Sequence, residues 1–388
     1  MASALAIGVS GIFLALGSCS SNDSAPAPAS EGGEAAVVTP RSDAGPFDAG
    51  IDVVRPPPTI PGCVGAPIAL QVAGERGYVA VNVGYEAGVA DAQADVDAGP
   101  GQYSGTFLID FGSNGSTIDF GGFAPPGPAP STCAGDAAAP GASCSFVGFD
   151  FFGDWGTVQL TTADYSFLAT FPRQSGIIGT DFLSVYPFTL DYYGKRILKS
   201  EPSTFCTEAQ LLASGFAPLP ATGFYTKTVA NLRPLSDVIT DPDAATAGFS
   251  VPNIPTVPIT VAGVSALAQL DTGYDDRIIR HSVNVNEALL AAITKANPQL
   301  LIRDAAKDLY LTTCVPGISQ QAMAYHLQSA VTVEFIAQGG SVARREANPT
   351  LFVKQRLAEV ASCGGIETWT VPAAQLGASF MVDAQAVI

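Results

Sequence analysis

Basic residues and histidines are scarce in this sequence. Its 388 residues include 18 Lys and Arg against 35 Asp and Glu, a net charge of -17, and only two His. Surplus negative charge repels phosphate backbones, so the composition argues against nucleic-acid binding. The same surplus keeps a protein soluble outside the cell. It also suits acidic surroundings, because few bases accumulate positive charge as carboxylates are protonated.

The two histidines, His281 and His326, leave little room for metal or serine chemistry. No Cys-x-x-Cys spacing occurs in the sequence, so we expect no zinc site. A serine hydrolase needs a base next to its nucleophile, but neither histidine has a recognisable nucleophile context and Gly-x-Ser-x-Gly is absent. We therefore predict that the protein uses no metal and no cofactor.

Long charged helices are not expected either, since charged residues make up 14% of the chain and hydrophobic residues 47%. With 40 Gly and 29 Pro, the balance favours short strands joined by turns, as at residues 78–83 and 106–109. Helical spacing of apolar residues predicts one short amphipathic helix over residues 284–297. The fold class is therefore predicted as mainly β with a few short helices.

The N-terminal apolar run, residues 4–17, is too short to span a bilayer comfortably and is typical of a signal peptide. It is followed by Ser18 and Cys19, and the segment resembles a bacterial lipobox whose cysteine becomes lipidated, although no Lys or Arg precedes the run. Ser20 after this cysteine resembles lipoproteins sent to the outer membrane. We expect residues 1–19 to be the signal and lipobox of an exported lipoprotein, anchored through Cys19 at the outer membrane or cell surface.

Residues 20–62 are rich in Ala, Pro, Ser and Asp and show no apolar periodicity. This composition is typical of a disordered linker, so the segment is predicted to tether the folded part of the chain to its anchor.

The seven cysteines indicate disulfides in an oxidising compartment. Lipidation of Cys19 would leave six, which allow fifteen pairings. Proximity in sequence suggests two of the pairs and leaves the third: Cys133 with Cys144, Cys314 with Cys363, and Cys63 with Cys206.

Both halves of the remaining chain show the same order of motifs. In the first half, an apolar run over 105–109 leads into Asp110-Phe111-Gly112-Ser113, and residues 176–183 follow later. In the second half, residues 265–270 lead into Asp271-Thr272-Gly273-Tyr274, and residues 375–381 follow. Each half therefore contains an apolar strand, Asp-x-Gly, a long stretch, and an apolar element with Gly that leads into Phe.

This arrangement resembles the pepsin-like aspartic peptidases, and residues 266–273 also resemble the retropepsin form of the motif. The resemblance covers roughly residues 63–388 and implies a bilobal acid-protease fold, with two related lobes of six-stranded-barrel type and a cleft between them. We accordingly predict an N-terminal lobe over 63–200, an inter-lobe connection over 201–254 and a C-terminal lobe over 255–388. The implied partner is a peptide or unfolded protein substrate, and the protein is expected to be a monomer.

The resemblance implies that Asp110 and Asp271 form a catalytic pair. Two adjacent carboxyl groups share one proton because like charges cannot both ionise there, so one can activate a water while the other polarises the scissile carbonyl. Gly112 and Gly273 would let each turn approach its partner without a Cβ clash. The predicted function is an aspartic endopeptidase acting at acidic pH.

Support for the pair is expected from the residues that follow each aspartate. By the family pattern, Ser113 would hydrogen-bond the first carboxylate and Thr272 would bond to the opposite loop. Phe111 and Tyr274 depart from this pattern, since the family has Thr at the first position and Ser or Thr at the second. The alternative is therefore an inactive pepsin-like surface lipoprotein that binds extended peptides in the same cleft.

The second half is shorter than the first at its C-terminal end. Aligning Gly377 with Gly179 places Ile388 beside Leu190, so the sequence has no counterpart of residues 191–197. Either the sequence is cut short, or the sheet that these residues join is completed in another way.

A hairpin flap over the cleft, with an aromatic residue near its tip, is a further family feature. Residues 149–156 carry Phe151, Phe152 and Trp155 between glycines and are the candidate flap. The alternative is an ordinary hairpin whose aromatic side chains belong to the core.

Overall fold

A computed structural model describes most of the chain from residue 59 onward. The described residues are 59–84, 102–113, 115–123, 127, 132–137, 139–166, 173–221, 254–274, 279–312, 318–328, 332–347, 349–363, 365–382 and 384–387. The predicted signal peptide, the lipidation site Cys19 and nearly all of the predicted linker lie outside these ranges. None of the described helices is long and apolar enough to cross a membrane.

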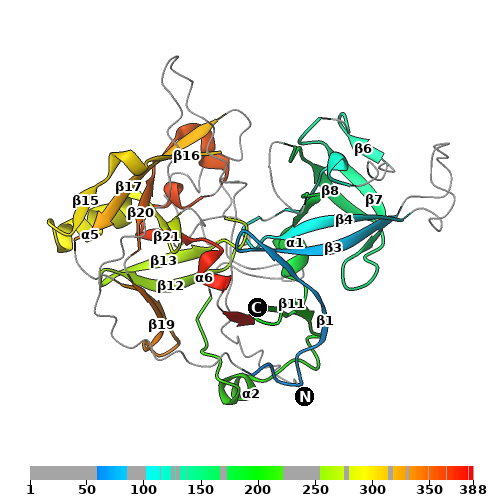
Figure 1. The fold of residues 1–388 in the computed structure, drawn as a ribbon, viewed down its shortest axis with the longest axis horizontal. Helices are drawn as coiled ribbons and strands as arrows, with labels where there is room; N and C mark the ends of the chain where they lie inside the picture. Colours follow the sequence, from blue (N-terminus) through cyan, green and yellow to red (C-terminus); the bar gives the residue numbers. More distant parts are fainter. Residues whose placement is uncertain are drawn as a thin grey trace, which may run out of the picture.

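The described part of the chain is mainly β, as predicted, and its strands form three sheets. Figure 1 shows the eight-stranded sheet on the right, the ten-stranded sheet on the left, and the four-stranded sheet below and between them. One large cluster of buried apolar side chains extends through both halves, from Leu70 and Val79 to Met381 and Ala386.

The eight-stranded sheet contains a closed barrel. Its strands are β2 (Gln71–Ala73), β3 (Arg76–Gly84), β4 (Gln102–Ile109), β5 (Thr117–Ile118), β6 (Thr132–Ala134), β7 (Ser143–Asp150), β8 (Val158–Thr162) and β9 (Gly176–Ile178). Six of them form the ring β3-β4-β9-β5-β8-β7, because β7 pairs with β3 as well as with β8. Buried and exposed residues alternate along β8, which is the pattern of a strand with one face on the core.

The ten-stranded sheet belongs to the second half. Its strands are β12 (Thr256–Val261), β13 (Val264–Leu270), β14 (Val283–Val285), β15 (Leu301–Arg303), β16 (Leu309–Thr312), β17 (Ser319–Leu327), β18 (Thr332–Ile336), β19 (Val342–Ala347), β20 (Leu351–Lys354) and β21 (Ala373–Leu376). The free side of β12 pairs with β18, and no strand pairing among the described residues closes a ring. The predicted barrel closure is therefore seen in the first half only.

The two halves nevertheless share an order of strand pairing. In the first, β4 is parallel to β9, β9 antiparallel to β5, and β5 parallel to β8. In the second, β13 is parallel to β21, β21 antiparallel to β14, and β14 parallel to β20. Asp110 follows β4 and Asp271 follows β13, so the repeated sequence motif corresponds to a repeated piece of structure.

The four-stranded sheet joins distant parts of the chain in the order β1 (Ala66–Ala69), β11 (Arg196–Lys199), β10 (Phe188–Asp191) and β22 (Gln385–Val387). Near the end of the chain, β22 pairs antiparallel with β10, and Gln385 Nε2 donates to Asp191 Oδ1 at 3.0 Å. The sheet that residues 191–197 enter is thus completed by β1 on one side and β22 on the other.

The helices are short. They are α1 (Thr180–Leu183), α2 (Glu208–Ala213), α5 (Glu287–Ala296) and α6 (Ser379–Val382), with 3-10 turns η1 (Phe120–Gly122), η3 (Ala305–Lys307), η4 (Ala358–Cys363) and η5 (Ile366–Thr368). The helix predicted over residues 284–297 is confirmed as α5. Its first turn is capped by Asn286, whose side chain accepts from Leu289 N at 2.9 Å, and its buried face includes Leu289 and Ile293.

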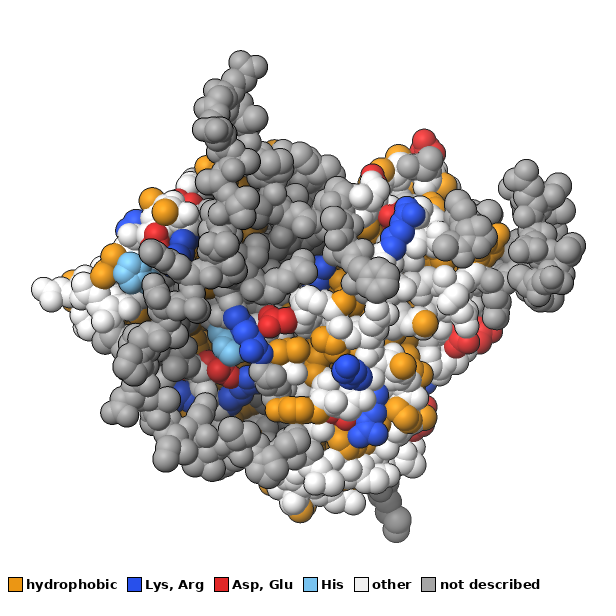
Figure 2. Space-filling model, in the orientation of Figure 1, with side chains coloured by type: hydrophobic (Ala, Val, Ile, Leu, Met, Phe, Trp, Pro, Cys, Tyr) orange, Lys and Arg blue, Asp and Glu red, His pale blue; other side chains and the backbone are white. Residues whose placement is uncertain are grey.

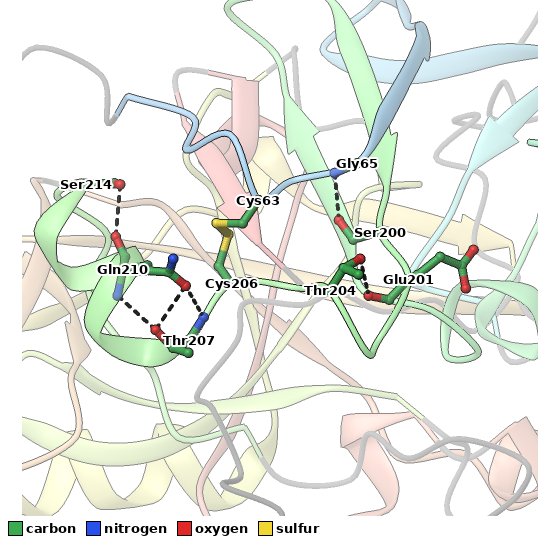
Figure 3. The surroundings of a disulfide bond; sticks show 9 residues. All are labelled: Cys63, Gly65, Ser200, Glu201, Thr204, Cys206, Thr207, Gln210 and Ser214. Atoms are coloured by element: carbon green, nitrogen blue, oxygen red, sulfur yellow. Dashed lines mark hydrogen bonds between the residues drawn. A yellow bond between two sulfur atoms is a disulfide. The ribbon is translucent and has the colours of Figure 1, made fainter.

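Two of the predicted disulfides are confirmed. Cys63 pairs with Cys206, and Cys133 pairs with Cys144 across the β6–β7 hairpin. The first bridge ties the segment before β1 to the loop before α2, beside the hydrogen bond from Gly65 N to Ser200 Oγ (Figure 3). The third predicted pair includes Cys314, which lies outside the described residues.

Ile60 lies within the predicted linker segment and belongs to the described residues. It packs against a small apolar cluster formed by Val64, Leu198 and Leu211 among others. Burial of an isoleucine there supplies the apolar contact that linker composition lacks.

In the orientation of Figure 1, apolar side chains with basic ones among them gather over the four-stranded sheet (Figure 2).

Candidate active site

The two aspartates occupy equivalent places at the ends of parallel strands. Asp110 N donates to Ile178 O of β9 at 3.0 Å, and Asp271 N donates to Leu376 O of β21 at 2.6 Å. Each aspartate is therefore fixed by the apolar element that the sequence places before Gly179 or Gly377. Asp110 is 5% exposed and Asp271 is 2% exposed.

The two Asp-x-Gly turns meet face to face. A Cβ atom added to Gly273 would lie 2.4 Å from Asp110 Oδ2 and 2.5 Å from Asp110 Cγ, which is closer than atoms can pack. The second turn therefore needs glycine because the carboxyl of the first lies directly against it. The two carboxyl groups lie close enough for each to act on the pKa of the other, and two buried like charges at such range cannot both ionise.

Backbone N–H groups orient each carboxyl. Gly112 N donates to Asp110 Oδ1 at 2.6 Å. Gly273 N and Tyr274 N both donate to Asp271 Oδ1 at 2.9 Å. Both turns thus aim N–H dipoles at the carboxyl oxygens, which favours the ionised form of an otherwise buried acid.

Thr272 connects the second turn to the first half. Its hydroxyl donates to Ile109 O at 2.8 Å and accepts from Phe111 N at 3.1 Å, and the residue is 1% exposed. The structure therefore places Thr272 in the bridging position that the family pattern assigns to it. Phe111 has no hydroxyl with which to return this bond, so the bridging by side-chain hydroxyls is one-sided.

The two departures from the family pattern are buried aromatic residues. Phe111 is 0% exposed and belongs to the large core cluster. Tyr274 is 1% exposed, packs with Leu311 and Phe352, and donates its hydroxyl to Asn284 Oδ1 at 3.4 Å. Both side chains thus pack into the interior of the protein.

Ser113 does not take the place that the family pattern assigns to it. Its hydroxyl donates to Gly115 O at 2.6 Å, and its N–H donates to Asp110 O at 3.2 Å. The backbone N–H of Ser113 therefore closes the turn after Asp110, and its hydroxyl bonds to the carbonyl two residues further on.

Burial dominates the electrostatics of the pair. It raises the pKa of Asp110 from 3.8 to about 6, against the lowering effects of the Gly112 N–H, the neighbouring Asp271 carboxyl and the cation of Arg76. Burial, together with the charge of Asp110, also raises the pKa of Asp271 well above its usual value, and the Lys354 cation acts in the opposite direction. Both effects keep one proton on the pair, which titrates as a unit.

Gln375 and Lys354 belong to the site and are not predicted from the sequence. Gln375 Nε2 donates to Asp271 Oδ2 at 2.7 Å, and Lys354 Nζ donates to Gln375 Oε1 at 3.3 Å. One feature of the sequence could have pointed to Gln375. It is a polar residue in the apolar segment before Gly377, where the matching segment before Gly179 is apolar.

The candidate flap residues are packed into the core. Phe151 is 1% exposed and stacks on Phe188 of β10 with ring centroids 5.8 Å apart, and Phe152 lies 5.9 Å from the same ring. Trp155 contacts Phe182 of α1 at 4.8 Å and donates its indole N–H to Phe151 O at 2.6 Å. This packing fits the alternative of an ordinary hairpin with core aromatics.

No group of three or more His, Cys, Asp or Glu side chains that could hold a metal ion is present in the part of the chain that the structure describes. No protein-family model matches the chain, and no curated protein matches it significantly in sequence. The carboxyl pair and its surroundings are thus the basis for assigning a function.

Proposed function

We propose that the protein is an aspartic endopeptidase of pepsin-like, bilobal fold, acting as a monomer on peptides or unfolded proteins. The observation that carries the proposal is the meeting of two equivalent Asp-x-Gly turns, which leaves the Asp110 carboxyl against Gly273 and close enough to Asp271 for each carboxyl to act on the pKa of the other. A buried carboxyl pair costs stability, so its presence at the meeting point of the two turns is best explained by chemistry on a substrate.

In the proposed reaction the pair begins with one proton. The ionised carboxylate takes a proton from a water, whose oxygen attacks the scissile carbonyl carbon, while the protonated carboxyl donates its proton to the carbonyl oxygen. In the resulting diol, the carboxyl that took the water's proton donates it to the amide nitrogen, the other carboxylate takes a proton from a diol hydroxyl, and the C–N bond breaks. Both fragments leave and the pair again holds one proton.

Activity is expected in weakly acidic to neutral solution. The pair works with a single shared proton, and burial raises the pKa of Asp110 to about 6. Below that pH both carboxyl groups become protonated and no base remains to activate water. Activity should therefore rise as the pH increases through about 6.

The second candidate is an inactive protein that binds extended peptides. It is favoured by Phe111, which removes half of the inter-turn hydroxyl bridging, and by Ser113, whose hydroxyl bonds to Gly115 O rather than to the carboxyl. Either change could leave the pair too loosely held for catalysis while the cleft remains.

The test is cleavage of a reduced, alkylated protein substrate by the purified full chain over pH 3 to 8. Asp110→Asn and Asp271→Asn should each lower kcat/KM by about a thousandfold, because the general base or acid is lost. Asp164→Asn, a change at an exposed aspartate that accepts from Ser166 N outside the pair, is the control and should leave activity unchanged. Undiminished cleavage by both pair variants would refute the proposal, and peptide binding without turnover would support the second candidate.

We also propose that the protein is an exported lipoprotein anchored through Cys19 at the outer membrane or cell surface. A Cys19→Ala variant should move from the membrane fraction to the soluble fraction of cells, and cells fed a labelled fatty acid should no longer label it. Retention of the variant in the membrane fraction would contradict the anchor.

A further inference from the structure

A buried chain of polar side chains lies behind Asp271. Gln375 donates to Asp271 Oδ2 at 2.7 Å, and its own Oε1 accepts from Asn284 Nδ2 at 3.1 Å and from Lys354 Nζ at 3.3 Å. Lys354 Nζ also lies 3.4 Å from Glu367 Oε2, and the two side chains are 2% and 3% exposed. A buried ion pair is costly to desolvate, so its place next to the carboxyl pair calls for an explanation.

The first half has no such network at the matching positions. Register aligns the two halves, since Asn284 pairs with Gln375 as Thr117 pairs with Ile177. Gln375 therefore matches Ile177, an apolar residue that packs with Tyr78 and Leu108. Asp110 thus has an apolar neighbour where Asp271 has an amide donor.

Lys354 is matched in the same way. Asn284 pairs with Phe352 on β20, and Thr117 pairs with Thr161 on β8. Two residues further along these strands stand Lys354 in the second half and Ala163 in the first. The cation is therefore also specific to the half that carries Asp271.

We propose that Gln375 and Lys354 are positioning residues for Asp271: Gln375 fixes its Oδ2 through the amide, and Lys354, neutralised by Glu367, holds the amide and supplies positive charge to the carboxyl pair. This inference rests on the proposed peptidase function. Gln375 holds the second carboxyl oxygen while Gly273 N–H and Tyr274 N–H hold the first, so Asp271 cannot rotate away from Asp110.

The electrostatic consequence has a definite sign. A donor to the carboxylate and a nearby cation both favour the ionised form, so loss of either should raise the pKa of Asp271. The other groups that act on the pair are Arg76 of β3 and Tyr192 after β10, which face Asp110. On the side of Asp271, the titratable and charged groups of the polar chain are Lys354, Glu367 of η5, and the Tyr274 phenol, which bonds to Asn284.

The experiment compares three variants with the wild-type full chain. Gln375→Met removes the amide and keeps the side-chain length. Lys354→Met combined with Glu367→Gln removes the cation without leaving an unpaired buried charge, which would unfold many proteins. Ile177→Met is the matched control at the equivalent position of the first half.

The first readout is a pH titration of the carboxyl carbons by NMR, with Asp carboxyls labelled and the pair assigned through Asp110→Asn and Asp271→Asn. Asp271 should titrate at higher pH in Gln375→Met and in the Lys354/Glu367 double variant, and at the wild-type pH in Ile177→Met. The second readout is kcat/KM against pH. Its acid limb should move to higher pH in the same two variants, and Gln375→Met should lose about tenfold at its optimum, the value of one charge-assisted hydrogen bond.

An unchanged Asp271 titration in the folded variants would overturn the inference. If Gln375→Met does not fold, the double variant alone decides the outcome. The titration needs no turnover, so the two proposals fail separately. A wild-type protein that cleaves nothing, yet shows the shifted titration in the variants, would refute the peptidase and keep the positioning role.

Discussion

The contact most worth perturbing is the Thr272 hydroxyl, because it bonds from the second turn to the backbone on both sides of Asp110. Thr272→Val keeps the shape of the side chain and removes its bonds to Ile109 O and Phe111 N, at 2.8 and 3.1 Å. A buried backbone group left without a partner costs about 1–3 kcal/mol, and the cost is partly offset because valine carries no polar atom to desolvate. We expect a loss of about 3 kcal/mol in the free energy of unfolding.

Thr180→Val is the matched control. The Thr180 hydroxyl is buried without a hydrogen-bond partner, so its replacement by a methyl group should change stability by less than about 0.5 kcal/mol or raise it. Urea unfolding with the disulfides intact is the assay, and the two tryptophans report separately, since Trp155 lies in the first half and Trp369 in the second. Equal unfolding midpoints for the two valine variants would refute the role of Thr272 as the link between the halves.

Two further predictions concern stability. Asp110→Asn should stabilise the folded protein at pH 7 by about 3 kcal/mol and lose most of this advantage by about pH 4. The reason is that a carboxyl whose pKa rises from 3.8 to about 6 on folding makes the wild type less stable as pH increases across that window; a pH-independent difference would contradict this. Removing Cys63 and Cys206 together, which close a separation of 143 residues, should cost about 5 kcal/mol. Removing Cys133 and Cys144, which are 11 residues apart, should cost about 3 kcal/mol. Denaturation without reductant measures both losses, and a larger loss for the Cys133–Cys144 pair would contradict the prediction.

Local pattern was enough to predict the elements that carry the aspartates. Alternating apolar residues indicated β3 and β4, and the helical spacing of apolar residues indicated α5. The repeat of an apolar strand, Asp-x-Gly and an apolar-Gly element marked the segments that the structure pairs, β9 with β4 and β21 with β13. These predictions hold because each depends on short-range chemistry or on an internal copy of the same motif.

Long-range contacts could not be predicted in the same way. Gln375 and Asp271 are 104 residues apart, and nothing local marks Lys354, at the end of an apolar strand, as a buried cation. The flap assignment rested on aromatic residues between glycines, a composition that suits a core hairpin equally well, and only their packing on α1 and β10 distinguishes the two.

The asymmetric features of the site all come from the second half. Thr272 reaches across to hold the backbone on both sides of Asp110, and Gln375 with Lys354 holds Asp271 from behind. The first half contributes Asp110 on a turn whose other side chains, Phe111 and Ser113, face the core or the local backbone. Residues of the second half therefore hold both turns, which explains how the two aspartates still meet although one of the two bridging hydroxyls is missing. Loss of support in the second half should accordingly disturb both aspartates, whereas loss of Ser113 should disturb neither.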